Sequence, residues 1–288
     1  MPRLIINADD FGLTSGVNRA IAEAGCVRAI TSATLMANSR AFAEAVLFAQ
    51  ELPALGIGCH IVLIDGDPVS SGLASLTNGG AQFRSSLKDF AFAAIKKRLS
   101  QQEIQREAEA QIRKIQSAGI VVTHVDTHKH THLFPHVLHP VLKAAKACGI
   151  RTIRNPFEPF KAWPKPVIAG RPSLWKRSLE VALLQKFSTA FRQLVDEEGI
   201  TTTDGSAGVI ATGGLNQSLL QATIEALPEG TWELVCHPGY ADADLARAGT
   251  RLVESRHVEL EALLSDETRK ALARRGVQLI SYADVKHL

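Results

Sequence analysis

Five side chains that can bind a metal ion or move a proton fall on alternate positions of one short stretch. They are His124, Asp126, His128, His130 and His132. The apolar residues 119–122 before them are typical of a β-strand, in which alternate side chains point to the same side. Four imidazoles and a carboxylate on one face need partners if they are buried. The pattern therefore favours a metal-binding or catalytic surface, with a solvated histidine-rich segment as the alternative.

The strand geometry also limits how many of these side chains one ion can bind. Positions four residues apart on a strand are separated by about 13 Å, so one ion takes one or two of the five donors. We expect His128 to bind the ion and Asp126 to lie beside or behind it. His130 and His132 would then point toward substrate or loop, and the remaining ligands must come from other strands.

Further acidic and histidine residues lie in or directly after other predicted strands. Asp9 and Asp10 follow one apolar run, His60 lies within a second, and His237 follows a third. In a parallel barrel the carboxyl ends of the strands meet at one mouth, where barrel enzymes place their chemistry. Two imidazoles and a carboxylate can hold a catalytic metal, and hydrolysis also needs a base and an acid. Taken singly, the aspartates could cap a helix and the histidines could be core or turn residues.

Strand and helix patterns alternate along the whole chain. Apolar and β-branched runs predict strands over residues 3–8, 31–36, 57–63, 120–126, 150–154, 208–211, 232–236 and 277–281. Helical patterns lie between them, chiefly over residues 15–27, 39–52, 87–118, 174–194 and 216–226 and from Pro135 onward. The Gly-, Ser- and Asp-rich loop 65–85 is long enough to predict a functional lid.

This alternation predicts an α/β fold with a parallel sheet. Seven or eight strand–helix units favour one closed, distorted (β/α) TIM-like barrel over residues 1–288. No GxGxxG motif follows the first strand, which weighs against a doubly wound sheet.

The composition is that of an ordinary globular protein. The chain has 288 residues, of which 45% are hydrophobic and 21% charged, and no apolar run reaches the roughly 20 residues of a spanning helix. Polar residues near the start exclude a signal peptide, so the cytoplasm is the expected location. The four cysteines show no CxxC spacing and are expected to be small buried residues rather than disulfides.

Residues 161–192 carry seven Lys or Arg against the single acid Glu180. We find no nucleic-acid reading element and expect no nucleic-acid partner. Instead, Trp163, Trp175 and nearby phenylalanines among the cations predict peripheral contact with an anionic membrane surface. The alternative is a solvated basic helix. We therefore expect a basic, Pro- and Trp-containing insertion around residues 156–195 of the barrel domain.

Four motifs together resemble the YdjC-like carbohydrate deacetylase family, which includes the diacetylchitooligosaccharide deacetylase. They are Asn7-Ala8-Asp9-Asp10-Phe11-Gly12, Gly56-Ile57-Gly58-Cys59-His60, the stretch from Thr123 to His132, and His237-Pro238-Gly239. The resemblance implies a distorted barrel and a divalent metal, magnesium first and zinc as the alternative, held by Asp10, His60 and His128. It implies Asp9 as general base and His237 as general acid in the hydrolysis of an N-acetyl group from an amino sugar.

More narrowly, the segment 153–159 resembles the hopanoid-biosynthesis-associated branch of this family, which implies a glycolipid such as a glucosaminyl hopanoid as substrate. We assign substrate binding to Asp126, His130, His132 and Arg154, and expect a homodimer. Two other functions fit the same residues. One is a metal- or sugar-binding barrel without turnover, and the other is a metal-dependent phosphoesterase.

Overall fold

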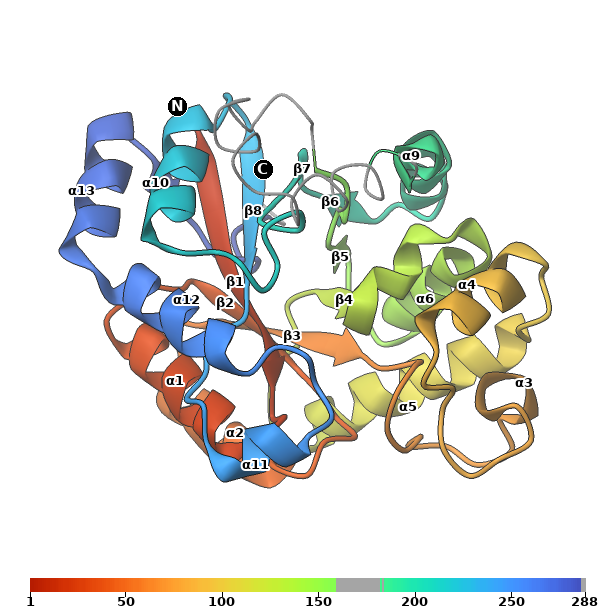
Figure 1. Cartoon of the computed structure of the whole chain (residues 1–288). Helices are drawn as coiled ribbons and strands as arrows, with labels where there is room; N and C mark the ends of the chain where they lie inside the picture. Colours follow the sequence, from red (N-terminus) through yellow and green to blue (C-terminus); the bar gives the residue numbers. More distant parts are fainter. Residues whose placement is uncertain (159–181, 183, 286–288) are drawn as a thin grey trace.

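A parallel β-sheet forms the centre of this computed structural model, which describes residues 1–158, 182 and 184–285 (Figure 1). The strand order is β6-β5-β4-β3-β2-β1-β8-β7, and β9 pairs with β1 on the amino-terminal side. The strands are β1 (Arg3–Phe11), β2 (Ser32–Leu35), β3 (Gly56–Ile61), β4 (Val125–Thr127), β5 (Thr152–Ile153), β6 (Thr201–Thr202), β7 (Gly205–Ala207), β8 (Thr231–Cys236) and β9 (Gln278–Leu279).

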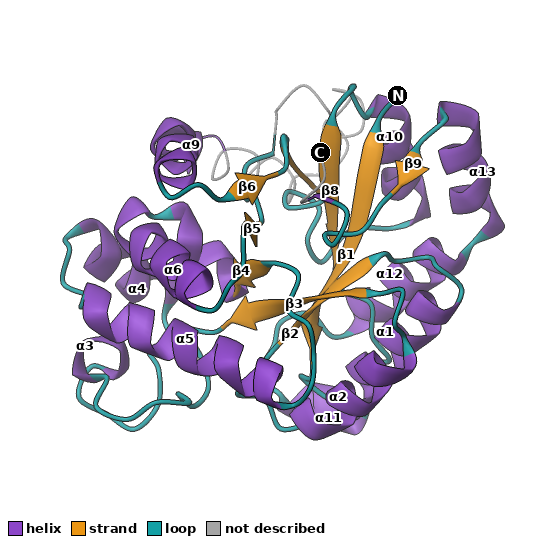
Figure 2. Ribbon diagram, turned by 180° about the vertical axis from the view of Figure 1, so that it is seen from behind, coloured by secondary structure: helices purple, strands orange, loops and turns teal. Residues whose placement is uncertain are grey.

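Helices lie in two groups on either side of these strands, and both views show this division (Figures 1 and 2). One group holds α1 (Ser15–Cys26), α2 (Phe42–Glu51), α10 (Gln217–Ala226), α11 (Ala243–Arg247), α12 (Glu254–Leu264) and α13 (Asp266–Arg275). The other holds α3 (Ala74–Thr77), α4 (Leu87–Ile95), α5 (Gln101–Ser117), α6 (Pro135–Ala147) and α9 (Ser188–Glu197). Two 3₁₀ segments, η1 (His128–Leu133) and η3 (Gln185–Phe187), complete the described elements.

The sheet is curled, but it is not closed by strand pairing among the described residues. The TIM-like α/β fold is confirmed, whereas the expected closure is wrong, because no ladder joins the edge strands β6 and β7. Single hydrogen bonds cross this gap instead, including one from Ser206 N on β7 to Phe157 O at 3.0 Å. Asn155 Nδ2 donates to Thr203 O at 3.0 Å, and Ser206 Oγ donates to Asn155 O at 2.5 Å.

Element boundaries differ from the expected ones where local backbone geometry interrupts a pattern. The segment 87–118 is two helices, because Lys97 adopts a φ of 55° and Ser100 caps α5 by accepting from Glu103 N. The strand expected over 208–211 is wrong. Gly208 has a φ of 91°, which turns the chain after β7, and the strand lies at residues 205–207 instead.

The starts of α1 and α6 agree with the sequence, whereas α2 begins at Phe42 rather than at the expected residue 39. Thr14 caps α1 by accepting from Val17 N, and Pro135 occupies the first turn of α6. Such caps satisfy amide groups that have no partner within the helix.

The cysteines agree only in part with the expectation that they are buried and free of disulfides. Cys59 and Cys236 are buried and free, but Cys26 is free and exposed, so the expectation of burial is wrong there.

The structure describes loop 65–85 but only a small part of the basic segment 161–192. The loop contains α3, and its role as a lid stays a prediction. The basic segment 161–192, with the insertion expected around it, lies largely outside the described residues, since these omit 159–181 and 183. Among the helices that the structure describes, none combines the length and apolar character needed to cross a bilayer.

Glu107 on α5 is fully buried and holds the start of this loop. Its two carboxylate oxygens accept from Val69 N at 2.8 Å and Ser70 N at 2.7 Å, and Gln111 Nε2 also donates to one of them. A hydrogen bond to a charged acceptor contributes about 1.5–3 kcal/mol. Removal of the Glu107 carboxylate would also leave its donors without this partner.

We expect Glu107→Ala to lower the free energy of unfolding by about 3 kcal/mol, and to expose loop 65–85 to limited proteolysis. Urea denaturation and peptide mapping measure the two effects. Glu109→Ala on the same helix is the matched control, because its pair with Arg113 is at the surface and contributes less than about 1 kcal/mol. Equal stability of the two variants would contradict this role for Glu107.

Candidate functional site

Polar side chains from four strands converge at the carboxyl ends of β1, β3, β4 and β8. The strand register brings them together. His60 on β3 pairs with Asp126 on β4, and Ala8 on β1 pairs with Cys236 on β8, which places Asp9 beside His237. All of these residues except Ala8 are titratable, and each is buried. The expected convergence at one mouth is therefore present.

Asp10 adopts a backbone conformation that a regular strand does not allow. Its φ is 66°, and the register between β1 and β2 shifts between Ala8 and Phe11. Successive side chains of a regular strand point to opposite faces, but this bulge leaves both Asp9 and Asp10 buried at the site, at 2% and 3% exposure. Left-handed backbone at a non-glycine residue costs on the order of 1 kcal/mol and clusters at functional sites.

Asp10, His60 and His128 form the group with the geometry of a metal site. Asp10 Oδ1 lies 3.5 Å from His60 Nε2 and 3.3 Å from His128 Nδ1, and the two ring nitrogens are 3.2 Å apart. Asp10 Oδ1 is buried with no hydrogen-bond partner among the described residues. A carboxylate oxygen and two imidazole nitrogens that face one point are suitable ligands for a divalent ion, so these residues fit the expected metal.

Asp126 lies behind this group rather than in it. Its Oδ1 is 2.7 Å from His60 Nδ1, and it is fully buried. If Nδ1 carries the proton of this hydrogen bond, His60 Nε2 presents its lone pair to the site, as in carboxylate–histidine–metal arrangements. Burial lowers the pKa of His60, but Asp126 and Asp9 more than offset it and raise it to about 10. The site therefore favours a positive charge at His60, which a bound cation would replace.

Asp9, His60 and Asp126 form a second group of potential ligands. Arg154 lies against both carboxylates of this group, with NH2 2.6 Å from Asp9 Oδ1 and NH1 2.5 Å from Asp126 Oδ2. A guanidinium in contact with both acids takes the position that a cation would need. Asp10, His60 and His128 are therefore better suited to hold a divalent ion than the second group is.

Arg154 is fully buried, and its guanidinium also contacts Glu233, at 2.7 Å. Burial alone would raise the pKa of Asp9, but Arg154 holds it well below its usual range. The expectation that Arg154 binds substrate is not supported by this position, because its charged head is engaged by three acids beneath the mouth. It orients Asp9 instead.

His237 lies on the other side of Asp9. Its Nε2 is 3.8 Å from Asp9 Oδ2, and its backbone N donates to Glu259 Oε2 at 2.6 Å. Burial lowers the pKa of His237 to about 4, although Asp9 and Asp10 oppose the shift. The ring is therefore neutral at pH 7 in the absence of a ligand.

The histidine stretch does not remain extended, so its side chains do not share one face. Strand β4 ends at Thr127, and Lys129 and His130 adopt φ values of 55° and 52° in the turn that follows. His132 is fully buried, with Nε2 3.2 Å from Arg154 O, which is not a position for substrate contact. His130 is partly exposed near the mouth and stays a candidate for substrate binding.

His124 is separated from the metal group at the other end of β4. It is fully buried, and its ring stacks on Tyr282 with centroids 3.7 Å apart. The alternation of the stretch therefore gave one residue of the candidate metal group, His128, and one carboxylate behind it, Asp126.

Several residues of the site had not been predicted. They are Thr34, Glu233, Arg256, Glu259 and Tyr282. Arg256 donates to Asp10 Oδ2 and so leaves Oδ1 for an ion. Glu233 could have been found, since a lone acid between Trp232 and Leu234 interrupts a buried strand. Nothing in the sequence around Arg256 distinguishes it from other charged residues of a surface helix.

A curled parallel sheet with a carboxylate–imidazole group at its carboxyl ends defines a TIM-like α/β protein with a candidate metal centre. The model of the YdjC-like protein family matches residues 3–274. The chain belongs to this family.

Relatives of full length carry deacetylase names. A carbohydrate deacetylase of Brevibacillus brevis is 32% identical over 284 residues, which cover 98% of this chain and 99% of that protein. A carbohydrate deacetylase of Geobacillus stearothermophilus is 33% identical over 99% of this chain and 98% of its own length. A chitooligosaccharide deacetylase of Proteus mirabilis is 29% identical, with 98% of both chains covered.

A solved structure has the same fold. A protein of Enterococcus faecalis, described as a cellobiose-phosphate cleavage protein, superposes with a TM-score of 0.75 at 24% identity, covering 98% of this chain and 97% of that one. At this identity the likeness shows the fold alone.

We expect Asp126→Asn to weaken binding of zinc or magnesium by about ten- to hundredfold, because His60 loses the partner that fixes its tautomer. His128→Ala, which removes a ligand, should weaken it further. Isothermal titration with each metal measures both, and circular dichroism checks the fold. His257→Ala, at an exposed histidine of α12, is the control and should bind as the wild type does. Wild-type affinity in both site variants would contradict the proposed ligand set.

Burial raises the pKa of Glu259 to about 7, although the His237 amide and Arg256 oppose the shift. Between about pH 4.5 and 7 the folded carboxyl keeps a proton that the unfolded one has lost. The free energy of unfolding therefore falls as pH rises through this window, by at most about 3 kcal/mol from this group.

Glu259→Gln should remove this contribution, so its stability relative to the wild type should increase between pH 5 and pH 8. Urea denaturation at both pH values measures the difference. Glu261→Gln, at an exposed position of the same helix, should show no such change. Parallel pH dependence in wild type and Glu259→Gln would contradict a raised pKa.

Proposed function

We propose that this protein is a metal-dependent carbohydrate deacetylase that hydrolyses the N-acetyl group of an N-acetylglucosamine-type sugar. The observation that carries the proposal is the arrangement of Asp10, His60 and His128 beside Asp9 and His237. These residues stand at one mouth of a chain whose full-length relatives are named carbohydrate deacetylases.

The roles of the protein's own residues follow from their positions. A bound divalent ion would polarise the amide carbonyl and lower the pKa of the attacking water. Asp9, kept ionised by Arg154, takes a proton from that water. His237 is neutral before the reaction. The proton that it passes to the leaving amine therefore comes from the attacking water through Asp9, whose Oδ2 lies 3.8 Å from His237 Nε2. The products are acetate and a free amino sugar.

The identity of the metal is part of the proposal. The family resemblance implies magnesium, whereas two imidazoles and one carboxylate are a donor set that zinc prefers, since magnesium favours oxygen ligands. Elemental analysis of protein purified without added metal identifies the ion. Acetate release after chelation and return of each metal shows which ion supports turnover.

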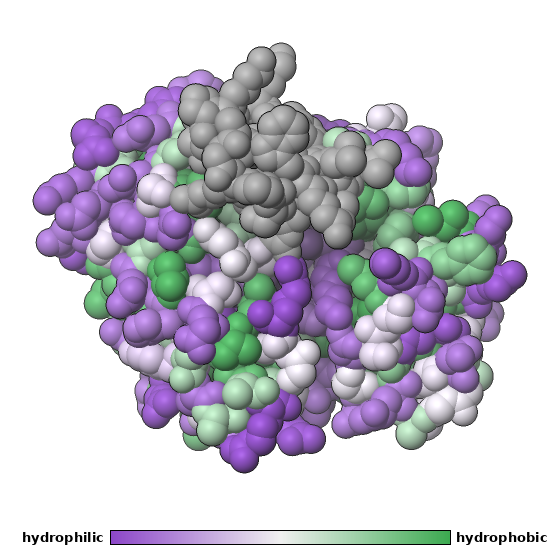
Figure 3. All heavy atoms as spheres, viewed as in Figure 1, coloured by the Kyte–Doolittle hydropathy of each residue, from purple (hydrophilic) through white to green (hydrophobic). Residues whose placement is uncertain are grey.

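A lipid-linked sugar is the second candidate substrate, in line with the resemblance to the hopanoid-associated branch. One described surface favours it. Leu87, Phe92 and Ile95 of α4 are exposed, and Lys96 and Arg98 lie over the Phe92 ring. The right side of Figure 3 shows green surface where Figure 1 places α4. Apolar side chains bordered by cations suit an anionic membrane surface.

Membrane contact through 161–192, a cytoplasmic location and a homodimer stay predictions from the sequence alone. The loop after β3 leads to α4, and this loop leaves the sheet at the same end as the site. A membrane bound at α4 would therefore meet the protein on the side of the sheet where the mouth opens.

An acetate-release screen tests the function. Chitobiose, N-acetylglucosamine and N-acetylglucosaminyl lipid in vesicles are incubated with the protein and either zinc or magnesium, and phosphate release from simple esters is measured in parallel. Acetate from any amino sugar supports deacetylation. Phosphate without acetate favours a phosphoesterase, and sugar binding without either product favours a binding protein.

We expect Asp9→Asn and His237→Ala each to lower kcat for acetate release by about 10²–10⁴, because each removes a proton-transfer group. Binding of metal should persist in His237→Ala. Asp266→Asn, at an exposed aspartate of α13, is the matched control and should keep wild-type kcat. Full activity in Asp9→Asn would exclude its role as base.

A further inference from the structure

We propose that Glu233 and Tyr282 are positioning residues, which hold Arg154 so that its guanidinium keeps the Asp9 carboxylate in the orientation needed for turnover. The inference deepens the proposed function and rests on Asp9 as its base. It concerns a buried chain of contacts that starts at the carboxyl-terminal segment after β9 and ends in the candidate active site.

The two adjoining edges of the Arg154 guanidinium are occupied by different acids. Nε and NH2 donate to Glu233 Oε1 at 2.8 and 2.7 Å, and NH1 and NH2 donate to the two oxygens of Asp9 at 2.9 and 2.6 Å. A planar guanidinium held on two edges cannot rotate about its Cδ–Nε bond without breaking a bidentate pair. Glu233 therefore fixes the plane in which Arg154 meets Asp9.

Charge balance alone does not account for Glu233. Arg154 already lies against Asp9 and Asp126, so Glu233 is a third buried acid around one cation. Burial raises the pKa of Glu233, although Arg154 opposes this. A third buried carboxylate is unfavourable by itself, so its contribution must come from the hydrogen bonds that it accepts.

Tyr282 fixes the other oxygen of Glu233. Its hydroxyl donates to Glu233 Oε2, where the other described donor, Ser206 Oγ, is 3.4 Å away. The tyrosine itself is fully buried and held at two further points. Its ring stacks on His124 with an interplanar angle of 13°, and its backbone N donates to Ser32 Oγ at 3.1 Å.

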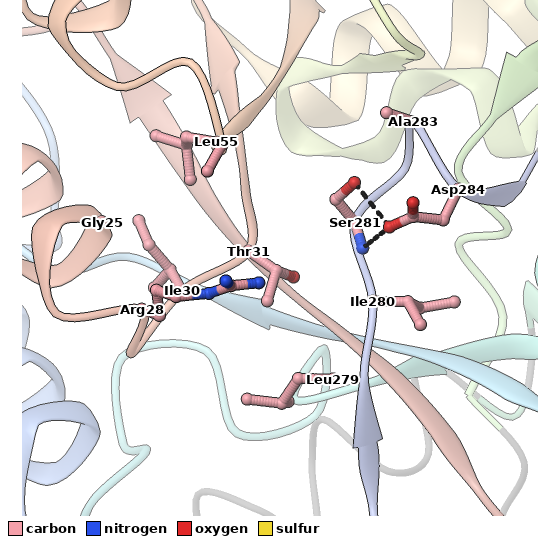
Figure 4. Close-up of a pocket in the computed structure, with 11 residues that line it drawn as sticks. Gly25, Arg28, Ile30, Thr31, Leu55, Leu279, Ile280, Ser281, Ala283 and Asp284 are labelled. Carbon is pink, nitrogen blue, oxygen red and sulfur yellow. Dashed lines mark hydrogen bonds between the residues drawn. The ribbon is translucent and has the colours of Figure 1, made fainter.

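The segment that carries Tyr282 is closed by a local turn. Ser281 donates to Asp284 Oδ2 through both its backbone N, at 2.7 Å, and its Oγ, at 2.9 Å (Figure 4). Figure 4 also shows Thr31 and Leu55 facing Ile280 and Ser281 across a pocket at the amino-terminal ends of β2 and β3. Tyr282 enters the curled sheet from this end, opposite the mouth, and so it supports Arg154 without access to substrate.

Steady-state kinetics of acetate release by the metal-loaded protein test the proposal. Tyr282→Phe removes only the hydroxyl, and we expect kcat to fall about fivefold to tenfold with KM and metal affinity unchanged. Glu233→Leu should lower kcat about a hundredfold, and Glu233→Gln, which still accepts from Arg154, should recover most of that loss. Tyr240→Phe changes the other tyrosine of the chain, whose hydroxyl meets Glu23 at the surface, and should keep wild-type kcat.

The double variant separates positioning from independent structural damage. Because Tyr282 acts through Glu233, Tyr282→Phe in the Glu233→Leu background should lower kcat no further. The proposal would be overturned if kcat of the double variant fell by the product of the two single reductions. Wild-type kcat in Tyr282→Phe would also overturn it.

Failure of the proposed function would be seen separately, as no acetate from the wild type. The positioning is then tested by NMR, through hydrogen exchange of the Arg154 Nε–H. Protection in the wild type that is lost in Glu233→Leu and reduced in Tyr282→Phe supports it. Equal protection in all three proteins overturns it.

Discussion

The candidate site depends on one buried cation shared by three acids. Arg154 has no exposed surface, and it contacts Asp9, Asp126 and Glu233. Removing such charges from water costs several kcal/mol per ion, and the cost is recovered only where hydrogen-bond geometry is good on every side. The same contacts join residues on or next to β5, β1, β4 and β8, and β5 and β8 are the strands next to the unpaired edge strands β6 and β7. The contacts that hold the Asp9 carboxylate therefore also link strands on the two sides of the open sheet.

The charges at the mouth are not balanced by the protein alone. Asp9, Asp10, Asp126 and Glu233 face two arginines, Arg154 and Arg256. The excess of acid explains why the pKa of His60 rises to about 10 despite burial. A divalent ion at Asp10, His60 and His128 would take over this positive charge and release the proton from His60, which makes metal affinity dependent on pH. The bulge at Asp10 and its contact with Arg256 leave one carboxylate oxygen directed at that point.

Predictions held where a residue's position depends only on the strand that carries it. Asp10, His60 and His128 end or interrupt separate apolar runs, so parallel pairing brings them to one edge, where the bulge at Asp10 completes the arrangement. Predictions failed where a single backbone torsion decided the result. Lys129 and His130 turn left-handed after β4, and Gly208 does so after β7. No local propensity at Lys129 or His130 indicates that change, and the extended histidine face was therefore wrong.

The sequence by itself determined the strand–helix alternation, the parallel sheet and the family, because these follow from periodicity and from motifs of adjacent residues. It also placed Asp9, Asp10, His128 and His237 at strand ends and His60 within a strand. Only the tertiary structure decided which groups support them. Glu233, Arg256 and Tyr282 lie 79, 246 and 49 residues along the chain from their respective partners Arg154, Asp10 and Glu233. Contacts over such separations are fixed by the curvature of the sheet and by burial, which no local pattern encodes.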